Sequence, residues 1–231
     1  MMKTLLSILL LSLSLMVYSQ ETHEPKNVMT VTGTAQIFAS PDEAIVRLGV
    51  AQNASTAQAA QSQANEIIQK LLTSLKSLGI AKENIQTSRM SLSPIYTQTR
   101  PGETPRIGSY QATDLLSIRV SDFSLVGKIV DAGTAAGIND VEGIDFELRN
   151  AREPRSRAYK EAVADARSKA DAVAEALGVK IVGIYDVETD GGAIAPQPRL
   201  MGMAKMAGAP TPVEPGQVEV SVTVTIRYQI G

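Results

Sequence analysis

The chain has no cysteine and no tryptophan among its 231 residues, and it has a single histidine, His23. Without cysteine the protein cannot form disulfides, thiolate nucleophiles or thiolate metal ligands. A lone histidine cannot form a histidine cluster, and His23 lies in a polar segment typical of a linker. These absences exclude Cys-His and Ser-His-Asp catalytic sites and the common zinc sites. Any catalysis would rest on carboxylates, lysine, tyrosine or serine.

The sequence also lacks an excess of charge of either sign. It has 22 Lys and Arg against 24 Asp and Glu, a formal net charge of −2, and both signs are spread along the chain. A nucleic-acid-binding surface needs a concentration of basic residues, and an anionic membrane attracts a polybasic run. We therefore predict no nucleic-acid partner.

One long apolar run is present, near the start of the chain. Lys3 precedes a Leu-rich stretch over residues 5–17, which is too short to span a bilayer and is typical of a secretory signal peptide. Small residues up to Ser19 predict cleavage before Gln20, and we predict no transmembrane span in the mature chain. The mature length can form one domain or two lobes. The predicted parts are a signal peptide, a linker and a mature domain, at residues 1–19, 20–27 and 28–231.

Alternating apolar and polar residues predict strands, and apolar residues spaced by three and four predict three amphipathic helices. The predicted strands are 28–38, 44–52, 85–96, 110–121, 144–148, 181–187 and 218–230. The predicted helices begin near Ser55, Asp122 and Arg152 and each end at a left-handed glycine, at Gly79, Gly137 and Gly178. The order ββαββαβαββ predicts an α+β fold of mostly antiparallel sheet with the three main helices packed on one side.

The arrangement of these strands suggests how copies of the chain meet. We interpret strands 28–38 and 44–52 as a hairpin, and we expect this hairpin and strand 218–230 to supply sheet edges. Exposed edges need protection or a partner. We therefore predict a homo-oligomer.

The third helix concentrates charge. Opposite charges lie four residues apart, and such pairs each stabilise a helix by roughly 0.2–0.5 kcal/mol. The predicted pairs are Arg157 with Glu161, Asp165 with Lys169, and Arg167 with Asp171. The predicted apolar stripe is Tyr159, Ala162, Ala166, Ala170, Val173 and Leu177. We interpret the charges as a solvated face and expect the Ala-rich stripe to lie close against a sheet. A carboxylate pair of Glu161 and Asp165 for acid–base chemistry is the alternative.

Residues 190–216 form a loop rich in glycine and proline, longer than an ordinary connection between strands. It contains Met201, Met203 and Met206, which are weak candidates for a metal site because thioethers suit Cu(I). The alternative is a loop with apolar anchors that lies at or near a contact between subunits. We predict no catalytic residue, no cofactor-binding residue and no bound cofactor.

Several segments, in order, resemble the SIMPL-domain family of exported bacterial proteins. The similar segments are VTGTAQIFASPDEAIVRLGV (31–50), GIAKENIQTSRMSLSPIY (79–96), the strand 110–120 with its following helix, GIDFELRN (143–150), the AYKEAVADARSKADAVAEALGV helix, and PGQVEVSVTVTIRY (215–228). The resemblance implies a periplasmic or outer-membrane-associated location and a link to oxidative-stress defence. The family has no established catalytic residues that could be transferred to this chain.

These observations lead to one functional hypothesis and one alternative. The hypothesis is a non-enzymatic cell-envelope protein that acts through self-assembly or through binding an envelope protein partner, in envelope or oxidative-stress defence. The alternative is a copper-handling protein that uses the methionine loop, or an envelope enzyme based on carboxylates or lysine.

Overall fold

A computed structural model describes residues 27–97, 104–197 and 213–231. Its elements are β1 (Val28–Ala39), β2 (Glu43–Ala54), α1 (Ala57–Ser77), η1 (Lys82–Asn84), β3 (Ile85–Tyr96), β4 (Ile107–Val120), α2 (Ser124–Ala136), β5 (Asp140–Glu147), α3 (Arg152–Leu177), β6 (Ile181–Thr189), β7 (Ala193–Gln197) and β8 (Gln217–Ile230). The α+β class and the predicted order of the main elements are confirmed, and the short strand β7 is an addition. The predicted signal peptide 1–19 lies outside the described residues.

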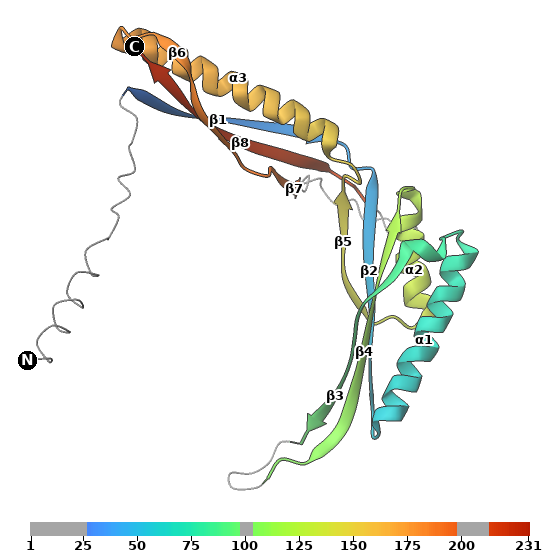
Figure 1. The fold of residues 1–231 in the computed structure, drawn as a ribbon. Helices are drawn as coiled ribbons and strands as arrows, with labels where there is room; N and C mark the ends of the chain where they lie inside the picture. The colour runs from blue at the N-terminus through green and yellow to red at the C-terminus, as the bar shows by residue number, and fades with distance from the viewer. Residues whose placement is uncertain (1–26, 98–103, 198–212) are drawn as a thin grey trace, which may run out of the picture.

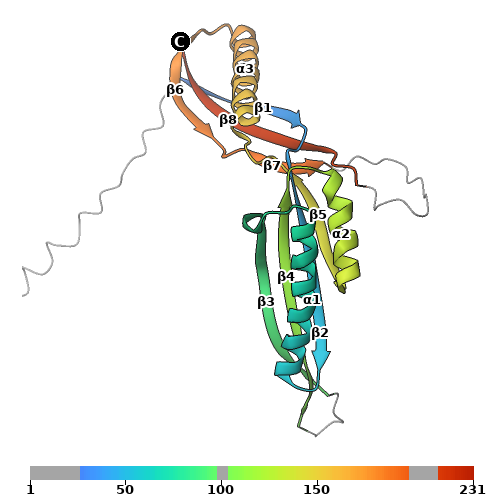
Figure 2. The same cartoon turned by 90° about the vertical axis from the view of Figure 1, so that its right-hand side faces the viewer.

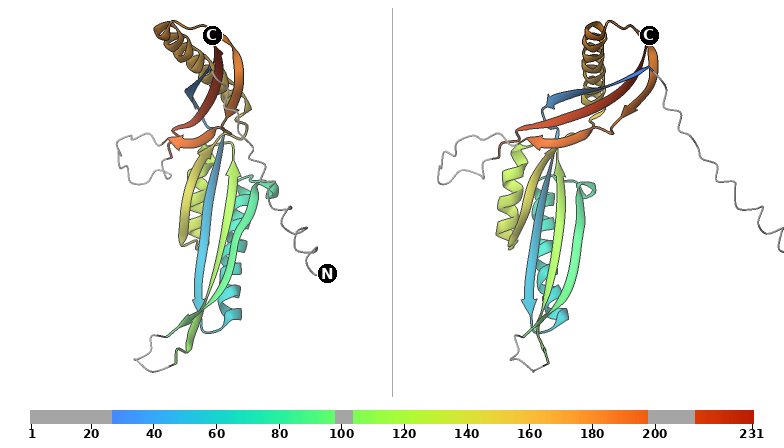
Figure 3. Two further views of the ribbon diagram at one scale, coloured as in Figure 1. Left: turned by 60° about the vertical axis from the view of Figure 1, so that its left-hand side comes forward. Right: turned by 90° about the vertical axis from the view of Figure 1, so that its left-hand side faces the viewer.

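The strands form two separate four-stranded sheets (Figure 1). Sheet A has the order β1-β8-β6. The short strand β7 pairs with the first part of β8, and β6 pairs with the rest of it. Sheet B has the order β3-β4-β2-β5. The six strand pairings among the described residues are all antiparallel. Figure 3 shows α3 on one face of sheet A, and α1 and α2 together on one face of sheet B.

The predicted hairpin of the first two strands is wrong, because β1 and β2 belong to different sheets. Residues 43–46 of β2 are buried without interruption. β2 lies inside sheet B, where it pairs with β4 on one side and β5 on the other. The expected edge at strand 218–230 is wrong for a related reason: β8 lies between β1 on one side and β6 and β7 on the other.

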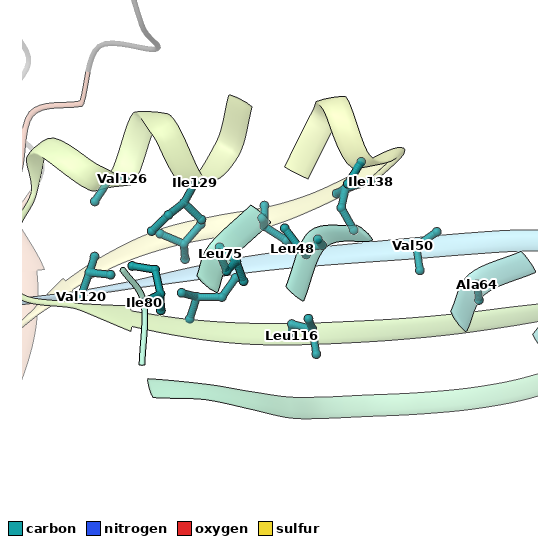
Figure 4. Close-up of a cluster of buried hydrophobic side chains, with 14 of the residues drawn as sticks. Leu48, Val50, Ala64, Leu75, Ile80, Leu116, Val120, Val126, Ile129 and Ile138 are labelled. Carbon is teal, nitrogen blue, oxygen red and sulfur yellow. The ribbon is translucent and has the colours of Figure 1, made fainter. Parts of the chain in front are cut away.

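Each sheet has its own apolar core. In sheet B, α1 and α2 cover β2 and β4, and Figure 4 shows Leu48, Leu75 and Ile129 converging between the helices and the strands. In sheet A, the alternating face of β8 packs with β1 against α3. The two cores are separate clusters, and the division of the mature domain into two lobes stays a prediction.

The contact between α3 and sheet A is very close, as the alanine stripe led us to expect. Gly33 of β1 lies directly beneath the helix: a Cβ atom at this position would stand 2.0 Å from the Ala162 carbonyl oxygen and 2.7 Å from the Ala166 Cβ. The buried stripe is Ala158, Ala162, Ala166, Ala170 and Ala174. The predicted places of Val173 and Leu177 in that stripe are wrong, since both are exposed. A contact this narrow accommodates methyl groups and excludes larger side chains.

The charges of α3 form a solvated face, and two of them also cover a sheet edge. Lys169 Nζ lies 2.7 Å from the Asp165 carboxylate and donates to the Thr32 carbonyl, while Asp165 accepts from the Thr34 N–H at 2.9 Å. The hydrogen bond from Lys169 and that from Thr34 lower the pKa of Asp165. Together these side chains cap the outer edge of β1, which would otherwise be open to another strand.

Two of the three predicted ion pairs on α3 are confirmed. Asp165 pairs with Lys169, and Arg167 pairs with Asp171 at 3.0 Å. Arg157 pairs at 3.9 Å with Glu153, on the preceding turn, instead of Glu161. Asp165 is engaged by Lys169 and by the Thr34 N–H of β1, which does not favour the alternative of an acid–base pair with Glu161. The helix ends are also confirmed: Gly79, Gly137 and Gly178 all have positive φ.

Candidate functional site

An apolar strip lies along the edge strand β3. From Gln86 to Tyr96 every side chain of this strand is exposed. Met90 and Leu92 lie opposite Asp114 and Ala112, which are buried beneath α1, so the strip is on the helix-facing side of sheet B. The β3 strip comprises Met90, Leu92, Pro94 and Tyr96, with Ile107 of β4 across from Tyr96.

The strip is exposed because the helices of sheet B cover β2 and β4 but do not extend over the edge strand β3. In Figure 2, α1 lies over β4 and β2 while β3 runs beside it without a helix above. Met90 is 64% exposed and Tyr96 is 57% exposed. Single exposed apolar residues are common on protein surfaces, but a contiguous row of them marks an interaction site.

The backbone edge of β3 is poorly suited to strand addition. Pro94 has no N–H group to donate, and the pairing of β3 with β4 is interrupted by register shifts at Thr87–Arg89 and at Ile95–Tyr96. Proline and bulges are devices that discourage edge-to-edge pairing. Any attraction therefore comes from the apolar side chains and not from the free backbone groups.

The β3 strip is also nearly free of charge. The one charged residue of the strand, Arg89, pairs with Glu142 of β5 at 2.9 Å, away from the strip. Depletion of charge distinguishes the centre of a protein–protein interface from the rest of a surface.

A second exposed apolar group lies on edge strand β6 of sheet A. It comprises Val182, Ile184, Tyr185 and Val187. Two register shifts interrupt the pairing of β6 with β8. Asp186 and Glu188 lie among the apolar residues, and Arg227 of β8 is across from Asp186, so this surface carries charges where the β3 strip carries none.

A polar cluster fixes the ends of β2 and β5 where the chain passes between the sheets. The Arg149 N–H donates to Asp42 at 2.6 Å, its Nε donates to Glu43 at 3.1 Å and its Nη2 donates to Ser121 at 2.6 Å. An adjoining cavity of about 410 Å³ is lined by Glu43, Glu83, Asn84, Arg119, Glu147, Leu148 and Arg149. The buried Glu43 carboxylate is held by Arg149, so this ion pair positions the connection between the sheets.

The residues proposed for metal chemistry are not tested by the fold. Met201, Met203 and Met206 lie outside the described residues, as does His23. Within residues 27–97, 104–197 and 213–231, no three His, Cys, Asp or Glu side chains are grouped so that they could hold a metal ion. No helix in those ranges is long and apolar enough to cross a membrane.

The β3 strip was not identified from the sequence, although its signal is present. Met90, Leu92, Pro94 and Tyr96 alternate with Arg89, Ser91, Ser93 and Ile95. That alternation predicts a strand with one face against a core. It contains no information about whether a helix of the same chain covers that face.

The chain is similar in sequence to several known proteins. Residues 29–228 match the SIMPL family, described as a protein of unknown function (DUF541). The 26 kDa periplasmic immunogenic protein of Brucella melitensis biotype 1 is 30% identical over 220 residues, covering 92% of this chain and 88% of that protein. The uncharacterized protein YggE is 25% identical in Edwardsiella ictaluri and 24% identical in Escherichia coli K12, each over 79% of this chain and over 75% and 73% of the relative. The predicted export to the periplasm agrees with the location named for the Brucella protein. The family match spans both sheets and all three helices, and the chain belongs to the SIMPL family.

Proposed function

We propose that this SIMPL-family protein is a non-enzymatic component of the cell envelope that acts by self-assembly or by binding an envelope partner. The observation that carries the proposal is the β3 strip, an uncharged apolar row that no helix of the described chain covers. The family resemblance adds defence of the envelope against oxidative stress as the biological setting.

The charge distribution favours a second copy of the chain as the occupant of the β3 strip. Two neutral strips can meet without repulsion between like charges. The β6 surface carries charges, because Asp186 and Glu188 lie on β6 and Arg227 of β8 is the cross-strand partner of Asp186. Self-assembly through the β3 strip would bury no charged side chain of the strip, whereas self-assembly through β6 would remove these charges from water.

We expect the double variant Leu92→Ser, Tyr96→Ser to weaken assembly strongly. Burying the exposed part of each side chain contributes about 1 kcal/mol, so a symmetric contact loses about 4 kcal/mol. That loss corresponds to roughly a thousandfold weaker dissociation constant. Light scattering over a range of concentrations should show an oligomer for the wild-type protein at micromolar concentration and a monomer for the variant.

The matched control is Val163→Ser, which removes an apolar side chain of similar exposure from α3: Val163 is 44% exposed and Leu92 is 45% exposed. This variant should assemble like the wild-type protein. A wild-type monomer at micromolar concentration would contradict self-assembly. If the double variant and Val163→Ser affected assembly equally, the β3 strip would not be the contact.

A further inference from the structure

Asp114 of β4 is a carboxylate buried in the core of sheet B. It is 3% exposed and lies in one row with Val50 of β2 and Met90 of β3. One oxygen, Oδ2, accepts a hydrogen bond from Gln61 Nε2 of α1 at 3.3 Å, and Oδ1 is buried with no partner. Ionising a buried carboxylate that has one neutral donor costs free energy, because the lost hydration is not replaced.

No cation compensates this carboxylate among the described residues. Burial raises the pKa of Asp114, and the hydrogen bond from Gln61 lowers it to a lesser extent. No charged group is among the causes of the shift. Glu66 and Lys70 of α1 are exposed, and Arg89 of β3 is paired with Glu142.

The two halves of α1, the helix above Asp114, bury different amounts of apolar side chain against sheet B. In its C-terminal half, Leu71 and Leu75 are wholly buried. In its N-terminal half, which contacts Asp114 through Gln61, the wholly buried residues are Ala60 and Ala64. Figure 4 shows Val50 as the labelled residue nearest to Ala64, with the larger cluster around Leu75 farther along the helix. Alanine buries much less apolar area than leucine, so the N-terminal half has less packing energy to offset a buried charge.

We propose that Asp114 makes the attachment of the N-terminal half of α1 depend on protons. When the carboxyl is protonated, residues 57–66 pack firmly on β4. When it is ionised, this half of the helix loosens, while the half held by Leu71 and Leu75 stays packed. The device lies beside the β3 strip, because Met90 is the neighbour of Asp114 across the sheet.

The direction of the pH dependence follows from the raised pKa. The ordinary value for this carboxyl is 3.8, and the folded protein holds it higher. The packing is therefore strongest below the unfolded value and weakens as the pH rises through the folded value. The change in protection amounts to about tenfold for each pH unit that separates the two values.

Hydrogen exchange detected by mass spectrometry tests the proposal on the intact protein. After correction for intrinsic exchange rates, we expect the amides of residues 57–66 to lose protection as the pH rises from below the ordinary value of the Asp114 carboxyl through its raised pKa, and those of residues 67–77 to change little. Asp114→Asn keeps the shape and removes the charge, so it should abolish this dependence. Glu66→Gln removes an exposed carboxylate from the same helix and should leave the dependence intact.

A wild-type protein in which both halves of α1 keep the same relative protection would overturn the proposal. So would an Asp114→Asn variant that retains the pH dependence. If that variant fails to fold, carbon-13 NMR of the wild-type Asp114 carboxyl provides the decision. A titration midpoint above the ordinary value supports the proposal, and one at or below it refutes the proposal.

Discussion

Gly33→Ala is expected to destabilise sheet A by about 3 kcal/mol or more, because the added methyl group has no space to occupy. Its Cβ would stand 2.0 Å from the Ala162 carbonyl oxygen and 2.5 Å from the Ala166 backbone nitrogen. Both contacts are to backbone, so no flexible side chain can move aside. The helix must lift from the sheet, and hydrogen exchange should show loss of protection along α3 while α1 is unaffected.

The control for this substitution is Gly191→Ala. Gly191 lies in the short connection between β6 and β7, and a Cβ there would have no atom within 4 Å. The free energy of unfolding of this variant, measured by urea titration, should lie within about 0.5 kcal/mol of the wild-type value. If Gly33→Ala lowered the free energy of unfolding as little as Gly191→Ala, α3 and β1 would not be in the close contact described.

Ala166→Asp is expected to cost about 3–5 kcal/mol, for two reasons that act together. Ala166 is wholly buried against Gly33, so a larger side chain overpacks the contact. The new carboxylate would also be a buried charge without a partner. Urea unfolding followed by circular dichroism should show a much lower midpoint for this variant.

Glu161→Ala provides the comparison on the solvated face of the same helix. Glu161 is exposed, so its removal should change the free energy of unfolding by less than about 0.5 kcal/mol. Lys169→Ala should have a larger effect, up to about 1 kcal/mol, because Lys169 also donates to the Thr32 carbonyl at the edge of β1. Equal losses for Ala166→Asp and Glu161→Ala would mean that the helix faces are assigned wrongly.

Local features of the fold could be predicted because their causes are local. The period of the apolar residues predicts the three helices, and the glycines after them predict the ends at Gly79, Gly137 and Gly178. The alternation of residues 218–230 predicts both the strand and its buried face. These signals need only neighbours along the chain, so one sequence is sufficient to find them.

The pairing of strands could not be predicted in the same way. β1 pairs along its full length with β8, from the opposite end of the chain. β2 follows β1 after a three-residue connection, yet it joins the other sheet. A hairpin is the usual outcome of such a short connection, but β2 pairs instead with β4 and β5, which follow much later in the chain.

The β3 strip could not be predicted from the sequence, because its exposure depends on which strands α1 covers. The β3 strip has the alternation of an ordinary half-buried strand, and it is exposed only because α1 lies over β4 and β2. Asp114 had a clearer signal: it stands in phase with Ala112, Leu116 and Ile118, so the alternation places it on the buried face. A charged residue in an inward position could have been recognised before the fold was known.

The central claim, that copies of the chain meet through the β3 strip, is tested most directly by a single thiol. The chain contains no cysteine, so Leu92→Cys introduces the only thiol group in the molecule. The rate at which a thiol reagent labels it should fall as the protein concentration rises into the range where light scattering shows an oligomer. In Val163→Cys, at a position of nearly equal exposure, the labelling rate should be the same at all concentrations. A Leu92→Cys thiol that is labelled equally fast in the dilute and the assembled protein would contradict the account.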